Sequence, residues 1–193
     1  MSMNTTCITY ADILRPSGRI SSIAYDTMLV LAGSILIALS AKIAFPLPFS
    51  PVPVTGQTFA VLLTGALLGS KRGVLAVLAY IAEGISGMPV FTGAGAGFAY
   101  LLGPTGGYIA GFAAAAGITG LLAEKGWDRN IFTTAMAMAA GSAAIYLFGV
   151  MWLSLFVGGR ALNMGLIPFI SGDIVKVALA AALLPAGWKL ITR

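Results

Sequence analysis

An unbroken run of 30 residues without a charged side chain, from Asn130 to Gly159, constrains the fold of this chain more than any other feature. A helix needs about 20 apolar residues to cross the roughly 30 Å of hydrocarbon in a bilayer. Only 9% of the 193 residues are charged and 59% are hydrophobic, whereas a soluble domain carries about 25% charged residues. The chain is therefore predicted to be an all-α integral membrane protein.

Polar and proline-rich breaks divide the chain into six predicted transmembrane helices. The prolines between residues 46 and 53 end the first span, because proline lacks the amide hydrogen that a helix needs. Residues 1–25 are interpreted as a polar tail with room for an interfacial helix, residues 26–190 as one six-helix transmembrane domain, and residues 191–193 as a C-terminal tail. The spans are expected near 26–45, 54–70, 71–87, 105–123, 130–159 and 166–190.

The positive charges indicate how the helices are oriented in the membrane. Eight of the eleven Lys and Arg residues lie in the two tails and in the second and fourth loops, whereas the opposite loops hold only Arg160. Because Lys and Arg are enriched in cytoplasmic loops, both termini are predicted to be cytoplasmic. The net charge of +5 forms no basic stripe, so nucleic acid is not expected as a partner.

Several classes of chemistry are excluded by composition. The chain has no histidine and a single cysteine, Cys7, so His-dependent nucleophile pairs and His- or Cys-ligated metals are excluded. No P-loop motif is present. An intramembrane aspartyl protease would need paired aspartates, but Asp26 and Asp173 are expected at opposite sides of the membrane. We predict no enzymatic activity, no metal and no cofactor.

Polar side chains within the predicted spans converge on the outer half of the membrane. At 1.5 Å of rise per residue, Gln57, Glu83, Asp173 and Lys176 all lie at similar depth. Ionisable residues in spans are costly and usually face a cavity or a ligand path, so these four residues are candidate ligand contacts. Two alternatives stay open: Asp173 and Lys176 are three residues apart and could neutralise each other, and Glu83 could make a structural hydrogen bond.

The loop between the third and fourth spans, residues 88–103, is uncharged and rich in glycine. Phe91, Gly95 and Tyr100 are its candidate ligand contacts, because glycine lets the backbone approach a ligand and aromatic rings suit a pocket wall. The loop is interpreted as a roof over the pocket, with residues 46–53 as a second rim. A tight re-entrant turn is the alternative.

A stripe of small residues lies on the first span. Ser34, Ala38 and Ala41 follow one another at steps of four and three residues, so they share one helix face. Small residues allow close helix packing in lipid. The stripe is a candidate interface with a partner helix, and packing within this chain is an equally good interpretation.

Four motifs in the chain closely resemble the BioY family. They are PVPVTGQTFAVLLTGALLG at 51–69, GMPVF at 87–91, LGPTGGYIAGF at 102–112 and PFISGDIVK at 168–176. BioY proteins are the biotin-binding S components of energy-coupling factor (ECF) transporters, with six helices and cytoplasmic termini. The resemblance implies biotin uptake at the plasma membrane of a bacterium or archaeon. It also implies a membrane-embedded T component and two ATPase subunits as partners.

The resemblance also implies roles for individual residues. Asp173 would accept hydrogen bonds from the ureido N–H groups of biotin, and Lys176 would face the polar end of the ligand or its carboxylate. Many relatives carry an arginine where this chain has Gly95, which leaves the partner of the biotin carboxylate open. Lys176, Lys42 and the backbone amides of the glycine-rich loop are the candidates. A stand-alone facilitator and an S component for another small carboxylated vitamin are the alternative functions. The pocket itself would be lined by Gln57, Glu83, Phe91 and Tyr100.

Overall fold

The computed structural model describes residues 8–191, most of which lie in helices. Six helices have twelve residues or more: α2 (Arg19–Ser40), α3 (Gln57–Leu68), α4 (Ser70–Ile85), α6 (Gly106–Ala123), α7 (Ile131–Val157) and α9 (Ile167–Ile191). Three shorter α-helices are α1 (Tyr10–Ile13), α5 (Phe98–Leu101) and α8 (Ala161–Gly165). Short 3-10 turns are η1 (Thr92–Ala94), η2 (Trp127–Arg129) and η3 (Gly158–Arg160).

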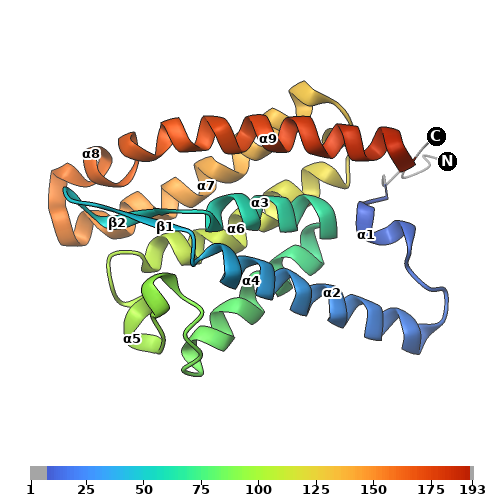
Figure 1. The fold of residues 1–193 in the computed structure, drawn as a ribbon, viewed down its shortest axis with the longest axis horizontal. Helices are drawn as coiled ribbons and strands as arrows, with labels where there is room; N and C mark the ends of the chain where they lie inside the picture. The colour runs from blue at the N-terminus through green and yellow to red at the C-terminus, as the bar shows by residue number, and fades with distance from the viewer. Residues whose placement is uncertain (1–7, 192–193) are drawn as a thin grey trace.

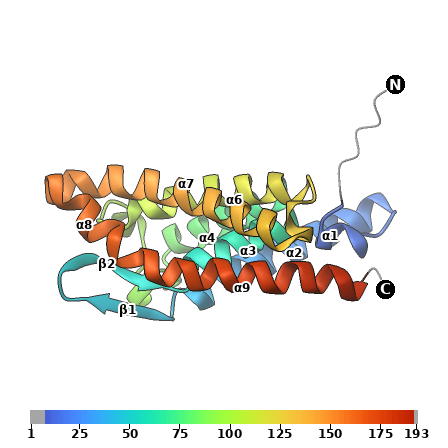
Figure 2. The same ribbon diagram turned by 90° about the horizontal axis from the view of Figure 1, so that it is seen from above.

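The long helices run along a common direction and give the molecule two distinct ends (Figure 1). One end carries α5, α8 and a β-hairpin, and the other carries α1 and the end of α9. Seen from above, the hairpin lies beside α8 and the first turns of α9 (Figure 2). Loops of opposite ends are therefore separated by the full length of the bundle.

Four segments are long and apolar enough to cross a membrane by length and composition: α2, α6, residues 131–165 and α9. The second and third predicted spans correspond to α3 and α4, which have only 12 and 16 residues. They meet at Gly69, whose φ of +85° a residue with a side chain rarely adopts. The first long helix also begins at Arg19, before the position near residue 26 expected from the sequence.

A two-stranded antiparallel hairpin replaces the irregular rim expected after the first span, so the fold is not purely helical. Strands β1 (Ala44–Leu47) and β2 (Ser50–Thr55) pair Ala44 with Thr55 and Leu47 with Ser50. Prolines are tolerated here because each strand of a two-stranded sheet has a free edge that needs no amide donor. The hydroxyl of Ser50 donates to the carbonyl of Met164 at 2.8 Å and fixes the hairpin against α8.

Helix α6 is the centre of the bundle, and it packs against α3, α4 and α7. Of its most apolar stretch, 61% is buried, compared with 17% for α2. Glycine allows the closest contact: a Cβ added at Gly65 of α3 would lie 2.3 Å from Thr119 Oγ1 and 2.5 Å from the Ala116 carbonyl of α6. Close backbone approach therefore holds α3 and α6 together, as is usual for helices packed in lipid.

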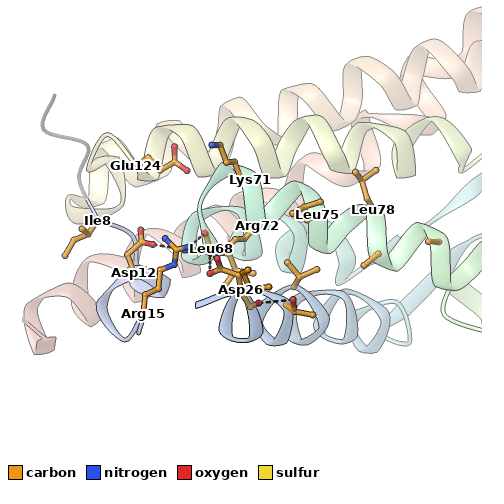
Figure 3. A pocket seen from close by; sticks show the side chains of 15 residues that line it. Ile8, Asp12, Arg15, Asp26, Leu68, Lys71, Arg72, Leu75, Leu78 and Glu124 are labelled. Carbon is orange, nitrogen blue, oxygen red and sulfur yellow. Dashed lines mark hydrogen bonds and ion pairs between the residues drawn. The ribbon is translucent and has the colours of Figure 1, made fainter. Parts of the chain in front are cut away.

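Ion pairs join three helices at the end that holds α1 (Figure 3). Arg72 of α4 contacts Asp12 of α1 at 2.9 Å (Nη1 to Oδ1) and Asp26 of α2 at 2.7 Å (Nε to Oδ1). Arg15 reaches the other oxygen of Asp26 at 2.6 Å. These side chains line a pocket of about 940 Å³ between α2 and α4, and none of the predicted ligand contacts lies in it.

Candidate functional site

A smaller cavity lies at the opposite end, between the hairpin and helices α3, α6, α7 and α9. It begins where β2 passes into α3, because Thr55, Gln57 and Thr58 turn their side chains into it. Its walls combine aromatic rings with hydroxyl, amide and ammonium groups. The lining residues include the aromatic Tyr100, Tyr108, Phe112, Tyr146 and Phe169 and the polar Thr55, Gln57, Thr58, Thr92, Thr105 and Lys176.

An ion pair on α9 forms the charged part of this site. Lys176 Nζ lies 3.1 Å from Asp173 Oδ1 and donates to Thr58 Oγ1 at 2.7 Å. The hydroxyl of Tyr146 donates to the other oxygen of Asp173. The side chains of Asp173 and Lys176 are only 12% and 16% exposed. The two residues therefore neutralise each other. Lys176 lines the cavity, whereas Asp173 stands behind it and lines a neighbouring hollow between α7 and α9. Their pairing is compatible with a ligand contact at Lys176.

Gln57 connects the cavity to the roof loop. As the first residue of α3, it is buried and lines the cavity. Its Nε2 donates to the Tyr80 hydroxyl at 2.6 Å, and its Oε1 accepts from the Thr92 hydroxyl at 2.9 Å. Both ends of the amide are thus held, and the loop at Thr92 is fastened to α3 through Gln57.

Only one of the three predicted loop contacts lines the cavity directly. Tyr100 does so, whereas Phe91 is fully buried behind it, with its ring stacked on that of Tyr100 at 4.9 Å. Gly95 packs against the same tyrosine: an added Cβ would lie 2.3 Å from the Tyr100 ring. Phe91 and Gly95 therefore support the position of Tyr100, and a direct contact of either residue with a ligand stays a prediction.

For Glu83 and the small-residue stripe, the structure favours the second of the two interpretations that the sequence leaves open. Ser34 Oγ donates to Glu83 Oε1 at 2.7 Å, which links α2 to α4 away from the cavity lining. Ser34 and Ala41 are fully buried, and Ala38 packs against the core. The stripe is thus covered within the chain, so it is not an open surface for a partner helix.

Two polar residues of the site, Tyr146 and Thr58, are not predicted from the sequence. Tyr146 is the single tyrosine in the uncharged run 130–159, and this is the signal that could have identified it. Thr58 follows Gln57 directly, but α3 turns both residues toward the cavity. Neither residue is charged at neutral pH, so a search for charges within spans does not find them.

A second hollow adjoins the cavity on the side of the hairpin and the loop at 92–105. We call it the vestibule; it has a volume of about 520 Å³ and shares Pro53, Thr92, Tyr100 and Thr105 with the cavity. Within residues 8–191, its lining contains no charged side chain. The other lining residues are Ala44, Pro46, Pro51, Gly93, Ala99, Gly103 and Pro104.

The sequence of the chain matches a known family. The sequence model of the BioY family matches residues 11–193. The chain belongs to the BioY family. This match confirms the resemblance seen in the four motifs. With its long apolar helices, the chain is a mostly helical, multi-pass membrane protein, and its relatives come from bacteria and archaea.

Individual BioY proteins resemble the chain over most of its length. "Probable biotin transporter BioY" of Pyrococcus horikoshii is 42% identical over 158 residues, which cover 81% of this chain and 92% of that protein. "Biotin transporter BioY" of Thermotoga maritima is 42% identical over 149 residues, 76% of this chain and 85% of that protein. A crystal structure of the S-component for biotin from an ECF-type ABC transporter superposes with a TM-score of 0.78 at 26% identity, covering 90% of this chain and 95% of that one.

Proposed function

We propose that this BioY-family chain is the substrate-binding membrane subunit of an ECF-type biotin uptake system, and that it is not an enzyme. The observation that carries the proposal is that Lys176, paired with Asp173, lines a cavity of aromatic rings and hydrogen-bonding side chains. The names of the relatives as biotin transporters and of the similar structure as a biotin S-component support the choice of ligand.

The chemistry of the cavity suits the ring system of biotin. A ureido group offers two N–H donors and one carbonyl acceptor. Asp173 would accept from the N–H groups, since a carboxylate forms strong charge-assisted hydrogen bonds. Lys176, 3.1 Å from that carboxylate, and the Thr58 hydroxyl, 2.7 Å from Lys176 Nζ, would serve the carbonyl. Tyr100 and Phe169 would flank the thin bicyclic ring.

We further propose that all six long helices cross the bacterial or archaeal plasma membrane, with both termini cytoplasmic. The distribution of Lys and Arg supports this orientation. The cavity would then open to the outside, because it lies at the end opposite to α1 and the end of α9. Residues 26–190 would be the membrane unit, flanked by a cytoplasmic tail at either end.

Uptake would need partners, because the sequence contains no P-loop for nucleotide binding. A T component in the membrane and two cytoplasmic ATPases would supply the energy. Between the cavity and the α1 end, the centre of the bundle is filled by apolar side chains such as Val61, Leu62 and Met138. Biotin would therefore reach the cytoplasm through a movement of the protein and not through a fixed polar channel.

Equilibrium binding of labelled biotin to the purified protein in detergent tests the proposal. Asp173→Asn and Lys176→Met should each weaken binding by roughly 10- to 100-fold, because each removes a hydrogen bond to a charged group. Lys125→Met removes an exposed lysine at the opposite end and should leave binding unchanged. Folded wild-type protein that binds no biotin would overturn the proposed function.

A further inference from the structure

We infer that the site recognises the ring system of its ligand and makes no use of the charge at the end of the acyl tail. The chain would then bind biotin esters and amides about as tightly as biotin itself. The inference deepens the proposed function and rests on it. Three observations carry it: the charge of the cavity, the position of the other cations at this end, and the uncharged vestibule.

The cavity carries no surplus positive charge for a carboxylate. Lys176 is its one charged lining residue within the described part of the chain, and Asp173 lies 3.1 Å from it. A ligand carboxylate placed on Lys176 would also lie a few ångströms from the Asp173 carboxylate, and two like charges at that distance repel strongly in a partly dry site. A neutral ring system with N–H donors avoids this repulsion and can donate hydrogen bonds to the Asp173 carboxylate.

The other cations at this end of the molecule face elsewhere. Lys42 Nζ donates to the Pro89 carbonyl at 2.6 Å, and Arg160 is exposed in η3. Neither residue lines the cavity or the vestibule. Burying a carboxylate without a cation or several hydrogen bonds is costly, so the structure favours a pose in which the ligand's charge stays in water.

The vestibule provides the route by which the tail reaches water. It joins the cavity through Tyr100 and Thr105, and it is walled by small and proline residues of the hairpin and by the loop residues Gly93 and Ala99. With the ring system at Asp173, the acyl tail would run past Tyr100 and end in the vestibule. An uncharged wall distinguishes poorly between a carboxylate, an ester and an amide at the end of this tail.

Competition binding tests the inference in the intact protein. Biotin methyl ester, biotinamide and ε-N-biotinyl-lysine should displace labelled biotin with affinities within about 3-fold of unlabelled biotin. An analogue methylated on a ureido nitrogen should be at least 100-fold weaker, because it loses the donor that faces Asp173. Ester and amide affinities 30-fold or more below that of biotin would overturn the inference while leaving the proposed function in place.

A substitution in the vestibule provides an independent test. Ala99 is exposed and lines the vestibule, so Ala99→Arg would place a cation beside the end of the tail. The variant should prefer biotin over its methyl ester by at least 5-fold, whereas the uncharged control Ala99→Gln should show no preference. If the wild type already prefers biotin over the methyl ester, and Ala99→Arg leaves this preference unchanged, the biotin carboxylate is recognised by another part of the site. That outcome would also overturn the inference.

Discussion

Asp128 is a buried acid in η2, which connects α6 to α7 outside the long helices. Its Oδ2 accepts from Trp188 Nε1 at 2.6 Å, and Arg129 lies 4.5 Å from the centre of the same indole ring. Its Oδ1 has no hydrogen-bond partner among the described residues. Burial raises the pKa of the Asp128 carboxyl above its ordinary value.

The raised pKa predicts a specific pH dependence of stability. Ionisation of Asp128 costs more in the folded than in the unfolded protein, so this group destabilises the fold at neutral pH. The penalty begins to shrink as pH falls through the raised folded pKa and is gone below the unfolded pKa. Asp128→Asn keeps an acceptor for Trp188 and removes the charge. Its melting temperature at pH 7.5 should exceed that of the wild type by about 2–4 °C for each kcal/mol recovered.

Thermal unfolding in detergent at pH 7.5 and pH 5 measures this difference. The advantage of Asp128→Asn should shrink at the lower pH, where the wild-type carboxyl is closer to neutral. A variant that melts below the wild type at both values would contradict the assignment of the penalty to the charge.

Among the elements, the contact between α3 and α6 depends on the absence of a side chain at Gly65. A methyl group there would meet the Ala116 carbonyl, a backbone atom that cannot rotate away. Gly65→Ala should therefore destabilise the protein by about 1–3 kcal/mol through overpacking. Gly159→Ala is the matched control, because an added Cβ there has no neighbour within 4 Å. Equal melting temperatures for the two variants would exclude a tight contact at Gly65.

Hydrophobic patterning was sufficient to predict the six long helices but not their ends or the hairpin. The prolines between residues 46 and 53 correctly predict where a helix cannot continue, yet they hide the strands, because proline is unfavourable in most sheets. In a two-stranded hairpin each strand keeps a free edge, so the penalty does not apply. Strand pairing depends on the partner strand, which local propensity does not contain.

The depth of polar residues in the membrane predicts part of the site. Which of these residues face the cavity depends on the rotation of each helix about its axis. Gln57 and Lys176 line one cavity, and Asp173 is joined to it through its ion pair with Lys176. Glu83 lies at a similar depth but faces Ser34 on α2. Counting residues from the end of a span gives the height of a side chain and not its direction, which is set by the packing of neighbouring helices.

At the scale of the whole molecule, Arg72 ties the N-terminal segment to the bundle. Its side chain is 13% exposed and contacts both Asp12 and Asp26, whereas the side chain of Arg15 is 44% exposed and contacts only Asp26. The burial of Asp12 opposes its ionisation, but hydrogen bonds from Thr9 and Arg72 outweigh this and lower its pKa.

Arg72→Met should therefore lower the melting temperature clearly more than Arg15→Met, since exposed ion pairs contribute at most about 1 kcal/mol. The stabilisation linked to Asp12 is present above its unfolded pKa and is lost as pH falls through the lowered folded pKa. Parallel melting curves of the two variants at pH 7 measure the difference. Equal losses would mean that Arg72 does not join the three helices energetically.

The unequal burial of α6 and α2 sets how freely each helix can change over evolutionary time. A replacement on α6 disturbs the interfaces with α3, α4 and α7 at once, so few alternatives are acceptable there. Much of α2 faces outward, where many apolar side chains dissolve equally well in lipid. Relatives that keep the same ligand should therefore differ in sequence mainly on the outer surface of α2, whereas the sequence of α6 should stay similar among them.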